Sequence, residues 1–176
     1  LVGGSDSDGT PSSSGKPTSV VLVTHESFAL PDELKAAFTK QTGLTLDVRA
    51  AGDAGTLTNK LVLTQGSPTG DVAFGVDNTF ASRALEADVF AAADVTLPAG
   101  AADFALPGGE QRLIPIDNAN VCVNIDTGWF AERGIPEPQT LADLTRKRYR
   151  NLLVIPGAAT SSPGLAFLLA TIASYA

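Results

Sequence analysis

Short apolar runs alternate with amphipathic segments from residue 20 onward, and this alternation restricts the chain to a small set of folds. Residues 20–24 (VVLVT) have the length and the apolar character of a buried strand, whereas residues 31–42 carry Leu34, Ala37 and Phe38 at helical spacing. Strands that alternate with helices form βαβ units, in which the strands run parallel and the helices cover the sheet. The sequence therefore predicts an α/β fold with a mainly parallel sheet and flanking helices.

The ends of the predicted elements carry ordinary start and stop signals. Pro31 suits the first turn of a helix, and Gly43 and Gly66 suit the position just after one. Residues 91–109 are rich in Ala, Pro and Gly and predict a long surface excursion. The expected strands are 20–24, 44–49, 71–76 and 152–155, and residues 120–125, after the apolar run 112–116, show an alternating strand pattern. The expected helices are 31–42, 53–65, 78–87 and 127–133, followed by a helical turn at 141–145 and an apolar helix from 164 to 176.

The two ends of the chain differ in character. Residues 1–19 (LVGGSDSDGTPSSSGKPTS) show no hydrophobic periodicity, and this composition predicts a disordered tether of the kind that links exported lipoproteins to a membrane anchor. The helix expected at 164–176 is apolar on all sides and should be covered by other structure. We therefore expect either that the chain is part of a longer two-lobed protein or that copies associate through this helix.

Composition excludes several classes of protein. The chain of 176 residues has 12 Lys and Arg against 19 Asp and Glu, a net charge of −7, which disfavours a nucleic-acid binder; the basic run at 146–150 predicts a solvated loop. With His25 as the single histidine and Cys122 as the single cysteine, a Cys/His metal cluster is excluded, and Cys122 is expected to be a buried thiol. Trp129 is expected to pack on the core.

Polar residues follow the predicted strands. Because ligands of parallel α/β sheets bind beyond the carboxyl ends of the strands, these residues are the candidate ligand-binding set. Helix capping is the alternative for each of them taken singly, but four carboxylates at one edge suggest a cationic ligand or a metal. The candidates are His25, Glu26, Asp53, Asp77, Asn78, Asp117, Ser161 and Ser162.

A second signal lies at residues 160–164 (TSSPG), directly before the last helix. Hydroxyl groups and free backbone N–H groups at a helix N-terminus bind phosphate or carboxylate. A ligand with a cation at one end and an oxyanion at the other would use both signals.

Signs of catalysis are lacking. Ser161 has no G-x-S-x-G setting, His25 has no second histidine beside it, and neither a phosphate-binding G-x-x-x-x-G-K-[ST] nor a G-x-G-x-x-G run occurs. The residues therefore favour binding over catalysis, with no catalytic residue, no metal and no cofactor expected.

Five segments carry a resemblance to a known family. The runs VLVTHESF, AGDAGTLTNKL, DVAFGVDNTF, LIPIDNANVCVN and ATSSPGLAFLL resemble, in order and spacing, the periplasmic thiamine-binding proteins of bacterial thiamine ABC transporters. These are type II substrate-binding proteins, with two α/β lobes that close around the ligand. The resemblance implies a first lobe at 20–118, and a crossover with the start of an incomplete second lobe at 119–176.

The resemblance also implies roles for the candidates. His25 and Glu26 stand where the family has a Tyr-Asp pair beside the ligand, and Asp53 matches its pocket aspartate. Asp77 and Asn78 match its Asp-Asn pair, and Ser161 and Ser162 the hydroxyls at the phosphate end of the site. The chain departs from the family pattern at Asp117-Asn118-Ala119-Asn120, where the family has Asp-Tyr-Gly-Tyr, so aromatic stacking on the ligand is weaker here.

The expected function is that of an extracytoplasmic receptor, in the periplasm or at the cell surface and lipid-anchored. It would capture thiamine or a thiamine phosphate and pass it to an ABC permease. The alternatives are a receptor for ferric iron or another small ion, a hydrolase that uses Glu26 or Asp53 as a base, and a structural surface domain without a ligand.

Overall fold

The computed structural model describes residues 18–176; residues 1–17, which hold most of the predicted tether, lie outside the described residues. A three-stranded parallel sheet forms the centre of the first part of the chain, in the order β2-β1-β3. Its strands are β1 (Ser19–Thr24), β2 (Thr45–Ala50) and β3 (Val72–Phe74). The expectation of a parallel α/β sheet with flanking helices is confirmed, and Ser19 belongs to the first strand rather than to the tether.

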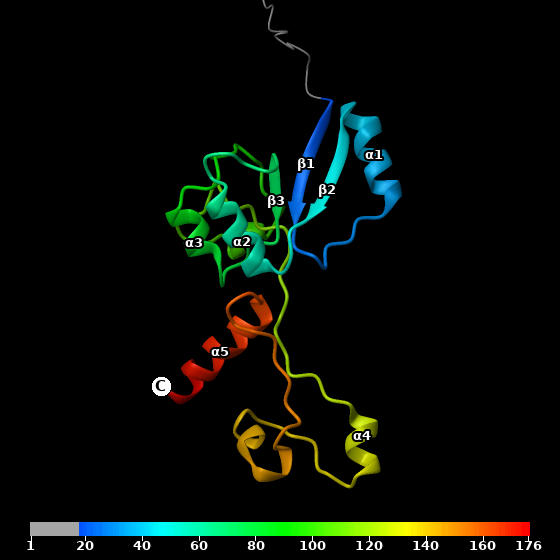
Figure 1. The fold of residues 1–176 in the computed structure, drawn as a ribbon, viewed down its shortest axis with the longest axis vertical. Helices are drawn as coiled ribbons and strands as arrows, with labels where there is room; N and C mark the ends of the chain where they lie inside the picture. Colours follow the sequence, from blue (N-terminus) through cyan, green and yellow to red (C-terminus); the bar gives the residue numbers. More distant parts are fainter. Residues whose placement is uncertain (1–17) are drawn as a thin grey trace, which may run out of the picture.

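Three helices accompany the sheet (Figure 1). Helix α1 (Asp32–Thr42) follows Pro31 and ends at Gly43, whose φ of 74° is the left-handed conformation that glycine adopts at low cost. Helix α2 (Ala54–Leu63) follows β2, and helix α3 (Ala81–Glu86) follows β3. The apolar face predicted for the first helix is covered only in part, because Leu34 is exposed and Phe38 is half-buried.

The core of this lobe lies between the sheet and α2. Val23 of β1 and Leu57 of α2 are buried together with Ala51, and Leu61 packs against them. Leu57 is fully buried. Because burying a leucine side chain contributes about 2 kcal/mol, these contacts fix α2 against the strands and thereby fix its N-terminus near the strand ends.

The order of the strands creates a switch point. The chain goes from β1 to β2 on one side and then returns past β1 to β3 on the other. Connections that leave in opposite directions open a crevice at the carboxyl ends of the strands. In Figure 1 these ends face the segments that lead to the rest of the chain.

The second part of the chain is a smaller body that two extended segments join to the first (Figure 1). The return segment leads into a longer C-terminal helix. Helix η1 (Ala101–Phe104) lies in the predicted surface excursion, before the smaller body. The elements that follow it are α4 (Thr127–Glu132), η2 (Ala142–Thr145), η3 (Lys147–Tyr149) and α5 (Ser162–Tyr175).

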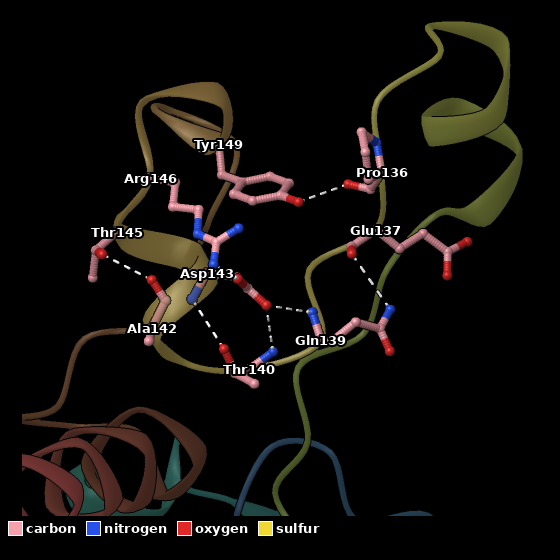
Figure 2. Close-up of polar contacts among 9 residues, drawn as sticks. All are labelled: Pro136, Glu137, Gln139, Thr140, Ala142, Asp143, Thr145, Arg146 and Tyr149. Atoms are coloured by element: carbon pink, nitrogen blue, oxygen red, sulfur yellow. Dashed lines mark hydrogen bonds and ion pairs between the residues drawn. The ribbon is translucent and has the colours of Figure 1, made fainter.

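Side-chain hydrogen bonds hold the turns of the smaller body together (Figure 2). Asp143 Oδ2 accepts the backbone N–H groups of Gln139 and Thr140, each at 3.0 Å, and the carboxylate pairs with Arg146 at 2.9 Å. The bond from the Gln139 N–H lowers the pKa of Asp143 most, and the Thr140 hydroxyl and the Arg146 charge lower it further. The buried Tyr149 donates its hydroxyl to the carbonyl of Pro136 at 2.8 Å.

Two predictions for this part of the chain are wrong. Residues 152–155 form no strand, and Val154 is 89% exposed, although the run LLVI predicted a buried strand. Residues 120–125 form no strand either, and Cys122, expected to be buried, is exposed. A strand needs a neighbouring backbone to complete its hydrogen bonds, and within residues 18–176 these runs pair with none.

The environment of Trp129 also differs from expectation, whereas the last helix is uncovered, as its apolar character and position in the chain led us to expect. Trp129 is only half-buried, with its ring edge-on to the buried Phe130 and the guanidinium of Arg133 lying 4.3 Å from its centre. On α5, Leu169 and Ile172 are 49% and 55% exposed. Association of copies through this helix stays a prediction.

Candidate functional site

The loops after the first two strands are tied to each other at the carboxyl edge of the sheet. Glu26 donates its backbone N–H to the carbonyl of Gly52 at 2.8 Å, and Ala51 donates to Thr24 at 2.8 Å. The loop after β1 also contacts β3, because the N–H of His25 donates to the carbonyl of Phe74 at 3.2 Å. The sheet topology therefore brings the loops after β1 and β2 together with the end of β3.

His25 lies at the switch point between β1 and β3. Its Nδ1 accepts the backbone N–H of Ser27 at 3.2 Å. Its ring centre lies 5.7 Å from that of Phe74, which in turn lies 5.0 Å from that of Phe28. These three half-buried rings form an aromatic cluster beside the candidate residues.

Asp53 caps a helix, whereas Asp77 closes a turn. Asp53 is the N-cap of α2, and its Oδ1 accepts the N–H of Ala54 at 2.9 Å, as predicted. Asp77 was expected to cap the third helix, but that helix starts only at Ala81. Asp77 instead accepts both the N–H and the hydroxyl of Thr79, at 2.9 and 2.6 Å, and so closes the turn before the helix.

The N-terminus of α2 meets the segment that leads into α5. The N–H of Gly55 donates to the carbonyl of Thr160 at 2.8 Å. A Cβ at Gly55 would lie only 2.8 Å from Thr160 Cα and 2.7 Å from Phe80 Cζ, so the approach requires a glycine. This contact brings Ser161 and Ser162 to the same edge of the sheet as Asp53.

The hydroxyl groups at the start of α5 are not used for capping. Ser161 is 4% exposed and, although it is the N-cap of α5, its side chain makes no capping hydrogen bond. The Oγ of Ser162 is buried and has no hydrogen-bond partner. An unsatisfied buried hydroxyl costs about 1–3 kcal/mol, so a ligand acceptor or donor at this position would be favoured.

The remaining candidates are more exposed. Glu26 and Asn78 are exposed, and Asp117 lies in the exposed segment that follows Ile116. Within residues 18–176 no three His, Cys, Asp or Glu side chains lie close enough to hold a metal ion. Glu26, Asp53 and Asp77 therefore follow the strands of the sheet without forming a tight cluster.

None of the eight candidate residues lines either of two apolar hollows in the molecule, although Phe74 of the aromatic cluster lines the second of them. One, of about 500 Å³, lies between residues 121–126 and 152–156 beside Trp129 and Phe167. The other, of about 740 Å³, lies along the outer side of β3. The candidate site is thus defined by its polar groups rather than by either hollow.

Sequence reasoning missed Phe74 and did not foresee the roles of Phe28, Gly55 and Thr160, which lie in segments that it had singled out. Phe28 and Phe74 supply aromatic rings that the sequence analysis did not assign to the site, and Phe74 is the last residue of β3. Gly55 and Thr160 make the contact between the two halves of the site. The sequence signals were a phenylalanine at the end of a strand and a glycine in the first turn of a helix. Neither points to a binding site, because both residues are common at such positions for structural reasons.

The comparison with known families shows to which family the chain belongs. The bacterial extracellular solute-binding protein family matches residues 67–175, which is more than half of the chain, and the chain belongs to this family. The match includes Asp77, Asp117 and Ser161, while His25 and Asp53 lie before it. No curated protein matches the sequence.

Membership of this family implies a substrate-binding role in transport, outside the cytoplasm, with an ABC permease as the general partner. Proteins of this kind are generally not enzymes. Within residues 18–176, no helix has the length and apolar character needed to cross a bilayer.

Proposed function

We propose that the chain is the receptor of an ABC importer that binds thiamine or a thiamine phosphate between two lobes of the type II arrangement. It performs no chemistry and passes the ligand to a membrane permease. The observation that carries the proposal is the contact between Gly55 and Thr160, because it brings the strand-end loops and the start of α5 together around one site.

The cationic end of the ligand would lie beside the strand-end carboxylates. Thiamine carries a permanent positive charge on its thiazolium ring, and Asp53, Asp77 and Glu26 supply negative charge along one edge of the sheet. The aromatic cluster of His25, Phe28 and Phe74 offers rings against which a flat heterocycle can stack. This partly replaces the aromatic residues that the chain lacks at 117–120.

The phosphate or hydroxyl end of the ligand would lie at the start of α5. This helix has 14 residues, and the N-terminus of such a helix favours an anion. The buried hydroxyl of Ser162 lacks a protein partner and the hydroxyl of Ser161 makes no capping hydrogen bond, so both would hydrogen-bond to oxyanion oxygens. A location outside the cytoplasm, with a lipid anchor on the tether, belongs to the same proposal.

A calorimetric melt of the 176-residue chain with millimolar thiamine, and in parallel with thiamine monophosphate, tests the proposal. Ligand at 100 times its Kd stabilises the folded state by about 2.7 kcal/mol, which raises the melting temperature by several degrees. Asp77→Asn should reduce the shift, and Asp103→Asn on η1, which removes the same charge away from the strand ends, should not. A cooperative melt that neither ligand moves would reject the proposal.

A receptor for ferric iron is a weaker alternative. Iron sites of this kind need several hard oxygen ligands at close range, and no three acidic or histidine side chains among residues 18–176 are close enough. A colour change on addition of ferric citrate, accompanied by a higher melting temperature, would favour iron over thiamine.

A further inference from the structure

The imidazole of His25 is held in one orientation by contacts on three sides. Its Nδ1 accepts the N–H of Ser27, and its ring packs on Phe74 at an interplanar angle of 33°. On the third side lies Gly75, where a Cβ would overlap Cδ2 of His25. Gly75 has a φ of +114°, a conformation that favours glycine, so both the backbone and the neighbouring ring exclude a side chain at this position.

These contacts determine which ring nitrogen carries the proton. A neutral imidazole has one N–H and one lone pair, and an Nδ1 that accepts a hydrogen bond must present its lone pair. The proton of the neutral ring therefore sits on Nε2. In the described part of the chain no group accepts a hydrogen bond from Nε2. Nε2 is not a buried unpartnered atom, so it is open to solvent.

The position of this unused donor connects it with the proposed site. His25 follows β1 directly, at the switch point with β3, and its backbone N–H is bonded to Phe74. The neighbouring acidic side chains accept hydrogen bonds and attract cations. Nε2 differs from them, because it offers a neutral donor to an acceptor atom.

We propose that His25 is a specificity-determining residue of this site, which donates a hydrogen bond from Nε2 to an acceptor on the ligand. The site then selects a heterocyclic cation that also carries a neutral ring nitrogen with a free lone pair, and it discriminates against cations without one. This inference rests on the proposed function, since it assigns a role within the same site.

Nitrogen NMR of the unliganded chain tests the proton position without any ligand. His25 is the only histidine, so its two ring nitrogens give the only imidazole signals. When the two nitrogen signals show that the ring is neutral, the Nε2–H tautomer should dominate. A dominant Nδ1–H tautomer, or an even mixture, would overturn the assignment.

Two ligands and two variants test the donor role. The ligands are thiamine and a benzylthiazolium analogue in which a phenyl ring replaces the aminopyrimidine, so that the cation stays and the ring-nitrogen acceptors are lost. His25→Phe keeps an aromatic ring but loses the N–H. Because one neutral hydrogen bond is lost, this variant should lower the affinity for thiamine roughly 3- to 10-fold. Its affinity for the analogue should stay within about twofold of the wild-type value.

His25→Gln provides the matched control, because its amide retains an N–H donor and should recover part of the affinity for thiamine. Unfolding of each variant is followed by circular dichroism, so that a folding defect is recognised. Equal losses for both ligands, or no loss for either, would overturn the donor role. If neither ligand binds the wild type, both the proposed function and the donor role of His25 are rejected. The NMR measurement still shows whether the Ser27 N–H fixes the proton of the ring on Nε2.

Discussion

The backbone N–H of Gly55 donates a 2.8 Å hydrogen bond to the carbonyl oxygen of Thr160. The bond joins the first turn of α2 to the segment that leads into α5, and so joins two regions that are far apart in sequence (Figure 1). Gly55 is buried, and its lack of a side chain permits the approach. Closure of the candidate site therefore depends on a position that carries no functional group.

Gly55→Ala should break this contact without weakening α2. Alanine is about 1 kcal/mol more favourable than glycine inside a helix, but its Cβ would meet the backbone of Thr160 and the ring of Phe80. We expect the amide at position 55 to exchange with solvent at least about tenfold faster, measured by hydrogen exchange. Gly66→Ala is the control, since a Cβ at Gly66 meets nothing within 4 Å. Unchanged protection at position 55 would contradict the prediction.

The sheet and the first two helices could be predicted because their signals are local. The run VVLVT has no polar interruption, and Gly43 takes the left-handed conformation that ends α1. Asp53 caps α2 because a short acidic side chain just before a helix can reach its first free N–H groups. In each case, residues close in sequence determine the structure.

The errors concern features that depend on distant neighbours. The run at 152–155 has the composition of a strand, but whether it pairs is decided by the backbone beside it. Likewise, the aromatic neighbour of His25 comes from β3, and the partner of Gly55 comes from the segment before α5. The sequence predicted the parallel sheet whose carboxyl edge carries the candidate residues, whereas the aromatic cluster and the contact between Gly55 and Thr160 required the three-dimensional structure.

Asp143 should make the smaller body sensitive to acid. Its pKa lies below the ordinary value of 3.8, chiefly because of the bond from the Gln139 N–H. A carboxyl whose folded-state pKa is lowered stabilises the fold above its unfolded-state pKa, and this stabilisation is lost as the pH falls through the folded value. Melting temperatures from about pH 6 down to about pH 3 should therefore fall less steeply for Asp143→Asn than for wild type. Asp103→Asn should follow the wild-type curve; equal slopes for all three proteins would contradict the assignment.

Tyr149→Phe should destabilise the smaller body by about 1 kcal/mol, the usual net value of one hydrogen bond, because it removes the bond to Pro136. Tyr149→Ala should cost about 3 kcal/mol or more, since the ring is buried against Phe130. Denaturant unfolding measures both. Tyr175→Phe is the matched control: Tyr175 is 61% exposed, so this variant should unfold like wild type. A similar loss in the control would show that the hydroxyl bond is not the cause.

Asp53 combines two roles that substitution can separate. Asparagine caps helices about as well as aspartate but carries no charge, so Asp53→Asn should leave the free energy of unfolding within about 0.5 kcal/mol of wild type. Asp53→Ala removes the cap as well and should cost about 1 kcal/mol. Both variants should lower the affinity for thiamine to a similar extent, because both remove the negative charge that would face the thiazolium ring. Titration calorimetry and denaturant unfolding on the same samples separate the two effects: if Asp53→Asn binds thiamine as wild type does, Asp53 serves α2 as a cap and the charge plays no part in binding.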